Sequence, residues 1–564
     1  MKDTITDISS DAAGGVRGDP CILSSKLIHQ CRLLLAELDV FQSAIASRFR
    51  KHQQQRHLSE TRTLRTNVSS ELRKLEKLAA EANTIQARKR ACVGEKGEEE
   101  GDEYVELSME ESRIFHALRS SNLPFYYTLW TIAKQHCRGV VGFSKRFYWE
   151  RDKRPMHERE KEAVDVDGKM TKRKLVNEDK KKSVFVDVVH QDGEEWVKIS
   201  TITENRLVME MAEKGWGMDS DEEEGDGSYD SQQRTVLRNN DSEEDDDDDQ
   251  IELIKVASDI VKAAQACRVR YKNPRVRIIL SRLEEGKVPE IDHVLGIVRS
   301  YGVTVEFGTN IPDILSDEAL GDRDPNSISE DDLPLSTLLP NPFEKFTSVV
   351  NVDCTILLAV VSDLSHIQQI EPSPSHHDVI RRQIEVEEEI SLLTAELWPA
   401  MAGHHIVCTK EAVNRMREIV DSVGTDTEKK RATIFLGEGE FQGLSREELV
   451  DQFQKLSDHA VPREWALPIK PVEAGKEIDD ARQQNRLPPV ASQVMEILSD
   501  INRSVFFYGW VRNIVTITSN KTVVKQIENV IERNRGDDNN LEGPMVWICD
   551  TARSLIGKER NRKP

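Results

Sequence analysis

The sequence lacks several features that would assign it to a common class of protein. No apolar run approaches the roughly 20 residues needed to span a bilayer, and the first 20 residues have no apolar centre like that of a secretory signal. The eight cysteines are scattered and form no CxxC pair, which favours small buried hydrophobes over disulfides or a zinc site. We therefore expect a soluble intracellular protein, cytoplasmic, nuclear or both, with no membrane partner.

The sequence is also short of positive charge and of common catalytic motifs. Lys plus Arg number 78 against 100 Asp plus Glu, a formal net charge of −22. This balance argues against a generally basic nucleic-acid coat but leaves room for one local basic groove. No GxSxG, HExxH, Walker A or GxGxxG motif occurs in its required context, so an ATPase, a serine hydrolase and a zinc peptidase lack support.

The N-terminal part carries two apolar stripes at helical spacing, separated by the polar segment 53–60. Two such helices predict an antiparallel hairpin, and a partner-binding coiled coil is the alternative. A charged break at 91–104 precedes further helix over 109–136, which Pro124 kinks or divides. The stripes consist of Leu27, Cys31, Leu34, Leu38, Phe41 and Ile45, and of Leu64, Val68, Leu72, Leu75, Ala79 and Ala82.

Strand patterns begin at residue 183. Within 183–200, β-branched residues alternate on both sides of Asp192-Gly193, a strong hairpin signal. Helical and strand segments then alternate up to Phe307, which predicts an α/β layer with parallel pairing. The expected helices are 205–214, 251–267 and 288–301, and the expected strands are 276–280 and 303–307.

Composition divides the chain into two α/β domains of different size. The fold class is α/β, with an N-terminal helical hairpin plus a small α/β domain and a C-terminal parallel-sheet α/β domain. The charged run that starts at Lys145 and the acidic runs after residue 217 cannot bury enough apolar surface to fold. The expected divisions are a disordered N-terminus 1–20, an N-terminal domain 21–310 with disordered inserts at about 148–183 and 217–250, a linker 311–344, a C-terminal domain 345–557 and a basic tail 558–564.

The inserts suggest regulation rather than chemistry. The basic clusters 172–174 and 180–182 indicate either a nuclear-import signal or a solvated loop. Ser220 and Ser242 lie in acidic surroundings of the kind that acid-directed kinases accept, so both are candidate phosphorylation sites.

Acidic residues follow two apolar strands of the C-terminal domain. Asp353 ends the strand 349–352, where open α/β sheets place functional groups, although it could equally cap the next helix. Thr409 is a plausible N-cap after the strand 404–408. Glu411, and further along Glu418 and Asp421, could join Asp353 around Mg²⁺ or Mn²⁺, or Glu411 could be an acid favoured by the helix dipole.

A third polar element, 516–521, follows Ile514-Val515. Its hydroxyls and amide, with Thr518 and Asn520 as candidates, could meet a phosphate or a metal-bound water. They could as readily form a turn that local hydrogen bonds satisfy.

Four segments in this order, KSVFVDVVHQDGEEWVKIS, NVDCTILLAVVSDLSH, RATIFLG and TITSN, resemble the eukaryotic uncharacterised family built on domain of unknown function 1308. The C-terminal half of that family is similar to a PIN domain, the fold of many metal-dependent ribonucleases. The resemblance implies that Asp353 is the first PIN acid, that Thr355 is the hydroxyl residue after it, and that Glu411 or Glu418 is the second acid. Asn520 would stand near the last position of the motif.

One departure from the PIN pattern decides our hypothesis. Where the pattern has an acid at the start of the helix before TITSN, the alignment places Trp510, which cannot ligate Mg²⁺; Asp500 or Glu496 would have to substitute. We therefore expect an eroded metal site and a binding or scaffolding role, with an unknown protein or RNA as partner.

Two alternatives stay open. The first is an active Mg²⁺- or Mn²⁺-dependent ribonuclease with Asp353, Glu411 and Glu418 as catalytic candidates, Asp353 and Glu411 as metal ligands, and Thr355, Thr518 and Asn520 facing RNA. The second is an interaction hub that works through the acidic residues 217–250. No cofactor is assigned beyond the Mg²⁺ or Mn²⁺ that a functional site would need.

Overall fold

The computed structural model describes eleven stretches of the chain: residues 19–48, 51–96, 102–149, 183–216, 250–308, 311, 314, 323–371, 376, 378–549 and 553–556. Both phosphorylation candidates, Ser220 and Ser242, lie outside the described residues, as do the basic clusters 172–174 and 180–182 and most of the expected inserts and tails. The fold is mixed α/β, as expected, and divides into two compact units. Unit 1 extends to Pro340 without Arg48–Arg50 and Arg268–Asn273, and unit 2 comprises Asn341 onward together with these two segments.

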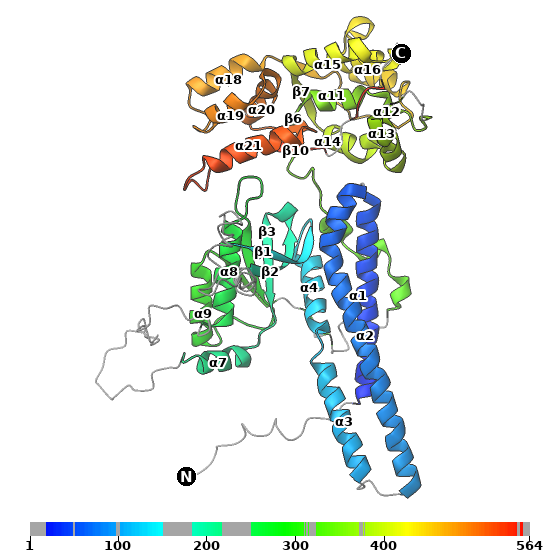
Figure 1. The fold of residues 1–564 in the computed structure, drawn as a ribbon, viewed down its shortest axis with the longest axis vertical. Coiled ribbons are helices and arrows are strands. Elements are labelled where there is room, and N and C mark those ends of the chain that lie inside the picture. Colours follow the sequence, from blue (N-terminus) through cyan, green and yellow to red (C-terminus); the bar gives the residue numbers. More distant parts are fainter. Residues whose placement is uncertain are drawn as a thin grey trace, which may run out of the picture. The chain divides into compact units, whose positions relative to one another are not determined.

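Unit 1 begins with four helices: α1 Pro20–Arg48, α2 Lys51–Lys96, α3 Asp102–Arg119 and α4 Leu123–His136. The first two lie side by side as the predicted hairpin (Figure 1), and the Cys31 thiol of α1 lies 3.6 Å from the Val68 carbonyl oxygen of α2. The polar segment 53–60 is not a connector, because α2 already begins at Lys51. Pro124 divides rather than kinks its segment, since it occupies the first turn of α4, where a missing N–H costs no hydrogen bond.

The sheet of unit 1 has five strands in the order β1-β2-β3-β4-β5. The expected hairpin is confirmed by antiparallel pairing of β2 with β3, and the expected parallel pairing by β3 with β4 and β4 with β5. The strands are β1 Gly142–Tyr148, β2 Ser183–His190, β3 Glu195–Ser200, β4 Arg275–Leu280 and β5 Thr304–Phe307.

Strand β1 is a correction to the expected charged insert, because the residues from Lys145 to Tyr148 pair antiparallel with β2. Its aromatic side chains explain why a charged segment joins the sheet. Phe143 is buried, and the ring of Phe147 stacks on Trp196 with a centroid distance of 3.8 Å. The two charged residues of this strand, Lys145 and Arg146, are adjacent, so the aromatic contacts and not an alternating pattern account for its place in the sheet.

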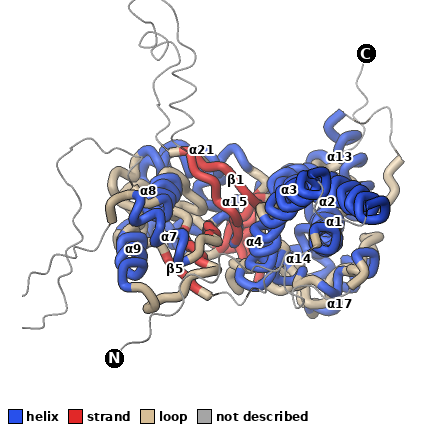
Figure 2. The backbone as a smooth tube through the Cα atoms, turned by 90° about the horizontal axis from the view of Figure 1, so that it is seen from below, coloured by secondary structure: helices blue, strands red, loops and turns tan. Residues whose placement is uncertain are grey.

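Three helices, α7 Glu204–Glu213, α8 Glu252–Gln265 and α9 Pro289–Ser300, cover one face of this sheet. Figure 2 shows them on one side of the strands and α4 on the other. The expected linker contains a further short helix, α10 Leu335–Leu338, whose leucines are buried. The Val140 N–H donates to the Leu338 carbonyl at 2.7 Å, so this part of the segment belongs to the fold of unit 1.

Unit 2 contains an all-parallel sheet in the order β10-β9-β6-β7-β8. Strand β6 is central, with β9 and β7 on either side, so the carboxyl ends of these three strands meet at one edge of the sheet. The strands are β6 Val349–Val352, β7 His405–Thr409, β8 Lys470–Val472, β9 Val515–Thr518 and β10 Val546–Ile548.

Helices cover both faces of this sheet. The first group is α11 Cys354–Val361, α12 Asp363–His366, α13 Asp378–Glu389, α14 Trp398–Met401, α15 Lys410–Val423, α16 Asp426–Leu436 and α17 Arg446–Gln454. The second group is α18 Ala474–Gln483, α19 Ala491–Ile497, α20 Asp500–Arg512 and α21 Lys521–Arg533. In the described part of the chain, no helix is both long and apolar enough to cross a membrane.

Candidate functional site

The candidate site lies where β6 ends in the centre of the unit 2 sheet. Asp353 follows the last residue of β6, and only 2% of its surface is exposed. Its carboxylate oxygen Oδ2 accepts hydrogen bonds from the hydroxyls of Thr518 at 2.7 Å and Thr355 at 2.9 Å. These two threonines come from the end of β9 and the first turn of α11, so the fold brings together three of the residues that the sequence singled out.

Each of the two hydroxyls is itself held by a backbone N–H. The Ser519 N–H donates to the Thr355 Oγ1 at 3.2 Å, and the Asn520 N–H donates to the Thr518 Oγ1 at 3.0 Å. A hydroxyl has a single proton, and here both protons point to Asp353. While this arrangement holds, neither threonine can donate a hydrogen bond to a phosphate.

The surroundings of Asp353 disfavour negative charge. Burial raises the pKa of the Asp353 carboxyl, and the hydrogen bonds from Thr518 and Thr355 offset only part of that rise. Burial, with the neighbouring Asp353 as the next cause, raises the pKa of the Cys354 thiol to about 12. Both groups therefore favour their neutral forms more than exposed groups of the same kind would.

Buried polar groups continue below Asp353 along the same face of the sheet. The Asn351 side-chain amide donates to the Val505 carbonyl at 2.9 Å and to the Thr516 hydroxyl at 3.1 Å, while its own oxygen has no hydrogen-bond partner. Gly509 of α20 lies so close that a Cβ there would be 2.1 Å from the Thr516 Oγ1. Sequence reasoning missed Asn351, and it included Thr516 in the polar element 516–521 without naming it as a site residue. Their spacing of two residues from Asp353 and Thr518, inside apolar strands, is the signal that could have found them.

The end of β7 lies at the same edge of the sheet. Thr409 is the N-cap of α15, as expected, because its hydroxyl accepts from the Ala412 N–H at 3.3 Å; it also lies 3.1 Å from the Ser504 hydroxyl. Glu411 occupies the first turn of α15, and its carboxylate oxygen Oε2 is buried without a hydrogen-bond partner. A buried carboxylate oxygen without a donor is costly, so Glu411 is the second unusual acid at this edge.

The other acidic candidates do not converge on Asp353. The Glu418 side chain is 65% exposed and forms an ion pair with Arg415 at 3.0 Å, and Asp421 is exposed as well. The two acids considered as substitutes for a missing ligand are also on the surface: the Asp500 side chain is 92% exposed, and Glu496 is exposed.

Asn520 and Trp510 have structural partners of their own. The Asn520 side-chain oxygen caps α21 by accepting from the Val523 N–H at 3.3 Å. Trp510 does not stand at the start of the helix before β9: it lies in the last turn of α20, and its ring is 5.5 Å from that of Phe507. The helix begins ten residues earlier, at Asp500, which corrects the register assumed from the sequence.

The residues at this edge do not fit a resident Mg²⁺ or Mn²⁺. Such an ion needs free carboxylate oxygens, whereas the Asp353 oxygen Oδ2 already accepts two hydroxyl protons and Glu418 lies on the surface. Over the described stretches, no group of three or more His, Cys, Asp or Glu side chains is arranged to hold a metal ion.

Comparison with known proteins gives one match. A family model described as "Protein of unknown function (DUF1308)" matches residues 350–441. This segment extends from β6 through α16 and contains Asp353, Thr355 and Glu411 but neither Thr518 nor Asn520. The chain thus contains a domain of unknown function. No curated protein and no solved structure matches it.

Proposed function

We propose that this chain is an intracellular binding or scaffolding protein, acting in the cytoplasm or nucleus, whose unit 2 is a PIN-like domain without a working metal centre. The observation that carries the proposal is the hydrogen bonding of Asp353. Its Oδ2 accepts hydrogen bonds from the hydroxyls of Thr518 and Thr355, so this oxygen is engaged within the fold, and burial raises the pKa of the carboxyl above that of an exposed aspartate.

The same edge still has features of a contact surface. The backbone of Ser519 and Asn520 and the N-terminal turns of α11 and α15 meet there, which is where open α/β sheets bind their ligands. Ser519 is half-buried, so a partner can reach it. We infer that this edge contacts a protein or RNA partner through hydrogen bonds rather than through a metal ion.

The experiment measures RNA cleavage and partner contact separately. The purified full chain is incubated with labelled single-stranded RNA and Mn²⁺, beside Asp353→Asn and the matched surface variant Asp421→Asn. We expect no Mn²⁺-dependent cleavage by any of the three. Cleavage that Asp353→Asn abolishes and Asp421→Asn retains would overturn the proposal.

Partner contact is tested in cells with a photoreactive amino acid at Ser519 and, as control, at Glu440, an exposed residue elsewhere in unit 2. We expect a discrete cross-linked product at Ser519 and none at Glu440. Digestion with ribonuclease or protease then identifies the partner as RNA or protein. Absence of a product at Ser519 would contradict a binding role for this edge.

A second candidate function, a Mg²⁺- or Mn²⁺-dependent ribonuclease, is favoured by one observation. The buried Glu411 oxygen without a donor lies in the first turn after β7, the strand that pairs with β6. A carboxylate in this state would gain a partner from a cation. The cleavage assay above distinguishes this function from the first.

A further inference from the structure

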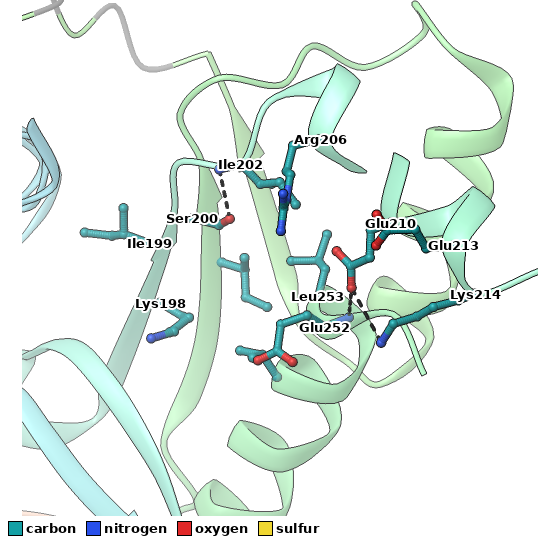
Figure 3. A pocket seen from close by; sticks show the side chains of 12 residues that line it. Lys198, Ile199, Ser200, Ile202, Arg206, Glu210, Glu213, Lys214, Glu252 and Leu253 are labelled. Carbon is teal, nitrogen blue, oxygen red and sulfur yellow. Dashed lines mark hydrogen bonds and ion pairs between the residues drawn. The ribbon is translucent and has the colours of Figure 1, made fainter. Parts of the chain in front are cut away.

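Unit 1 contains a cavity that the proposed function of unit 2 does not use. Its volume is about 610 Å³, within the range of small-molecule sites. Figure 3 shows it at the carboxyl ends of the parallel strands β3 and β4, between the sheet and the helices α7 and α8. In open sheets with parallel strands, ligands bind outside the carboxyl ends of the strands.

The inner wall of this cavity is apolar. It is formed by side chains of β4, of α8 and of the segment between β3 and α7, namely Ile278, Leu253, Val256 and Ile202. Ile278 and Leu253 also belong to the core of unit 1, so the wall is anchored in rigid elements. A ligand that fills the cavity therefore needs an apolar part.

Half of the charged side chains around the cavity already have partners in the fold. The Lys198 ammonium lies 3.2 Å from the buried Asp187 carboxylate. The Glu210 carboxylate accepts from the Glu252 backbone N–H at 2.7 Å and lies 3.8 Å from the Lys214 ammonium. These groups are charge-balanced without a ligand.

Three charges on the rim differ from these. Of the residues that the structure describes, none forms an ion pair with the Arg206 guanidinium or with the carboxylates of Glu213 and Glu252. Figure 3 shows Arg206 extending from α7 into the cavity and Glu252 on α8, so opposite charges face the cavity from different helices. Since the two groups do not pair with each other, a ligand that carries both charges can bridge them.

We propose that this cavity binds a zwitterion with an apolar body, that is, an apolar amino acid or a short apolar peptide. Its carboxylate pairs with Arg206, its ammonium group pairs with Glu252, and its side chains contact the apolar wall. A simple anion would face the carboxylates of Glu252 and Glu213, and a simple cation would face the Arg206 guanidinium, so like-charge repulsion selects against both.

The test is calorimetric titration of the full chain with L-leucine and with L-leucyl-L-leucine, which separates the two sources of this chemistry. We expect saturable binding of at least one of them. N-acetyl-L-leucine, which lacks the ammonium group, and L-leucinamide, which lacks the carboxylate, should each bind at least tenfold more weakly. Failure of both zwitterions to saturate in the millimolar range, or equal binding of N-acetyl-L-leucine, would overturn the proposal.

Variants assign the binding to the two rim residues. Arg206→Gln and Glu252→Gln, both at exposed positions, should each weaken binding at least tenfold without loss of folding, which circular dichroism checks. The matched controls are Arg113→Gln, an exposed arginine of α3, and Glu290→Gln, which lies in the first turn of α9 as Glu252 does in α8. Binding by Arg206→Gln or Glu252→Gln at the strength of the controls would refute the assignment.

Discussion

Replacing Arg431 by methionine tests the buried charge network that holds α11, α12 and α16 of unit 2 together. Arg431 is 2% exposed and donates four hydrogen bonds into the interior. Its Nη1 donates to Asp363 at 2.6 Å and to the Val361 carbonyl at 3.0 Å, and its Nε and Nη2 donate to the Leu456 carbonyl at 3.0 and 2.7 Å. Methionine retains much of the apolar stem but donates none of these bonds.

The expected loss of stability follows from what the substitution leaves behind. Breaking one side of a buried ion pair costs about 3–5 kcal/mol, because the remaining charge is uncompensated. Hydroxyls of Thr425 and Thr427 still donate to Asp363, which keeps the loss near the lower end of this range. The backbone carbonyls of Val361 and Leu456 also lose their hydrogen-bond donors, which increases the loss of stability. At about 1.4 kcal/mol per tenfold, the whole range corresponds to roughly 150- to 5,000-fold in the opening equilibrium.

Hydrogen exchange read by mass spectrometry is the suitable assay, because two compact units need not unfold together and a single midpoint would mix them. Peptides from α11 and α16 should exchange faster by the factor expected for the opening equilibrium. The exchange rate of peptides from β4, in unit 1, should not change. The matched control is Arg446→Met, an exposed residue of α17 that forms an ion pair with its neighbour Glu447. Exchange in α11 within threefold of the wild-type rate would refute the reasoning.

Three further predictions test the candidate site and the core of unit 1. Because burial raises the Asp353 pKa in the folded state, that state keeps a proton which the unfolded state has already lost. Unit 2 should therefore lose up to about 1.4 kcal/mol per pH unit as the pH rises from about 4 through the folded pKa. Asp353→Asn should reduce this slope, which hydrogen exchange in α11 peptides at pH 4.5 and 7.5, corrected for intrinsic exchange rates, would report. Gly509→Ala should destabilise unit 2 by about 1–3 kcal/mol through the contact with the Thr516 hydroxyl. The double variant with Thr516→Ala should lose less stability than the sum of the two single losses, and simple additivity would argue against the contact. Lys198→Met should lower the stability of unit 1 by about 3–5 kcal/mol, because the Asp187 carboxylate stays buried without its cation. Adding Asp187→Asn should restore most of that stability. Hydrogen exchange in β3 peptides would report both effects.

Local sequence pattern was sufficient where one side chain or one periodicity decides the structure. The stripe residues of α1, such as Leu27 and Phe41, are buried as the helical spacing required. Thr409 caps α15 because a threonine before an amphipathic run has few other local conformations as favourable. Asp192 adopts a φ of 57° in the turn between β2 and β3, a conformation that aspartate tolerates better than most residues.

Pattern was insufficient where the deciding contact comes from a distant part of the chain. Strand β1 has two adjacent charged residues and no alternating pattern, and it is a strand because β2 supplies its hydrogen bonds and Trp196 supplies a surface for Phe147. All residues of the run Ser504–Gly509 are buried, so the spacing of its apolar residues does not distinguish a helix from a strand. In the structure this run is part of α20. That assignment moves Trp510 to the end of its helix.

The sequence alone determined that the chain contains two α/β units, where most of their helices and strands lie, and that Asp353 ends a central strand. These properties depend on local periodicity and on the order of elements along the chain. The tertiary structure alone decided what Asp353 does there. Thr518 lies 165 residues away in sequence, and no local rule specifies that its hydroxyl points to the carboxylate rather than to solvent. Burial and donor geometry depend on which strands become neighbours, and these two properties decide whether a carboxylate is charged or neutral.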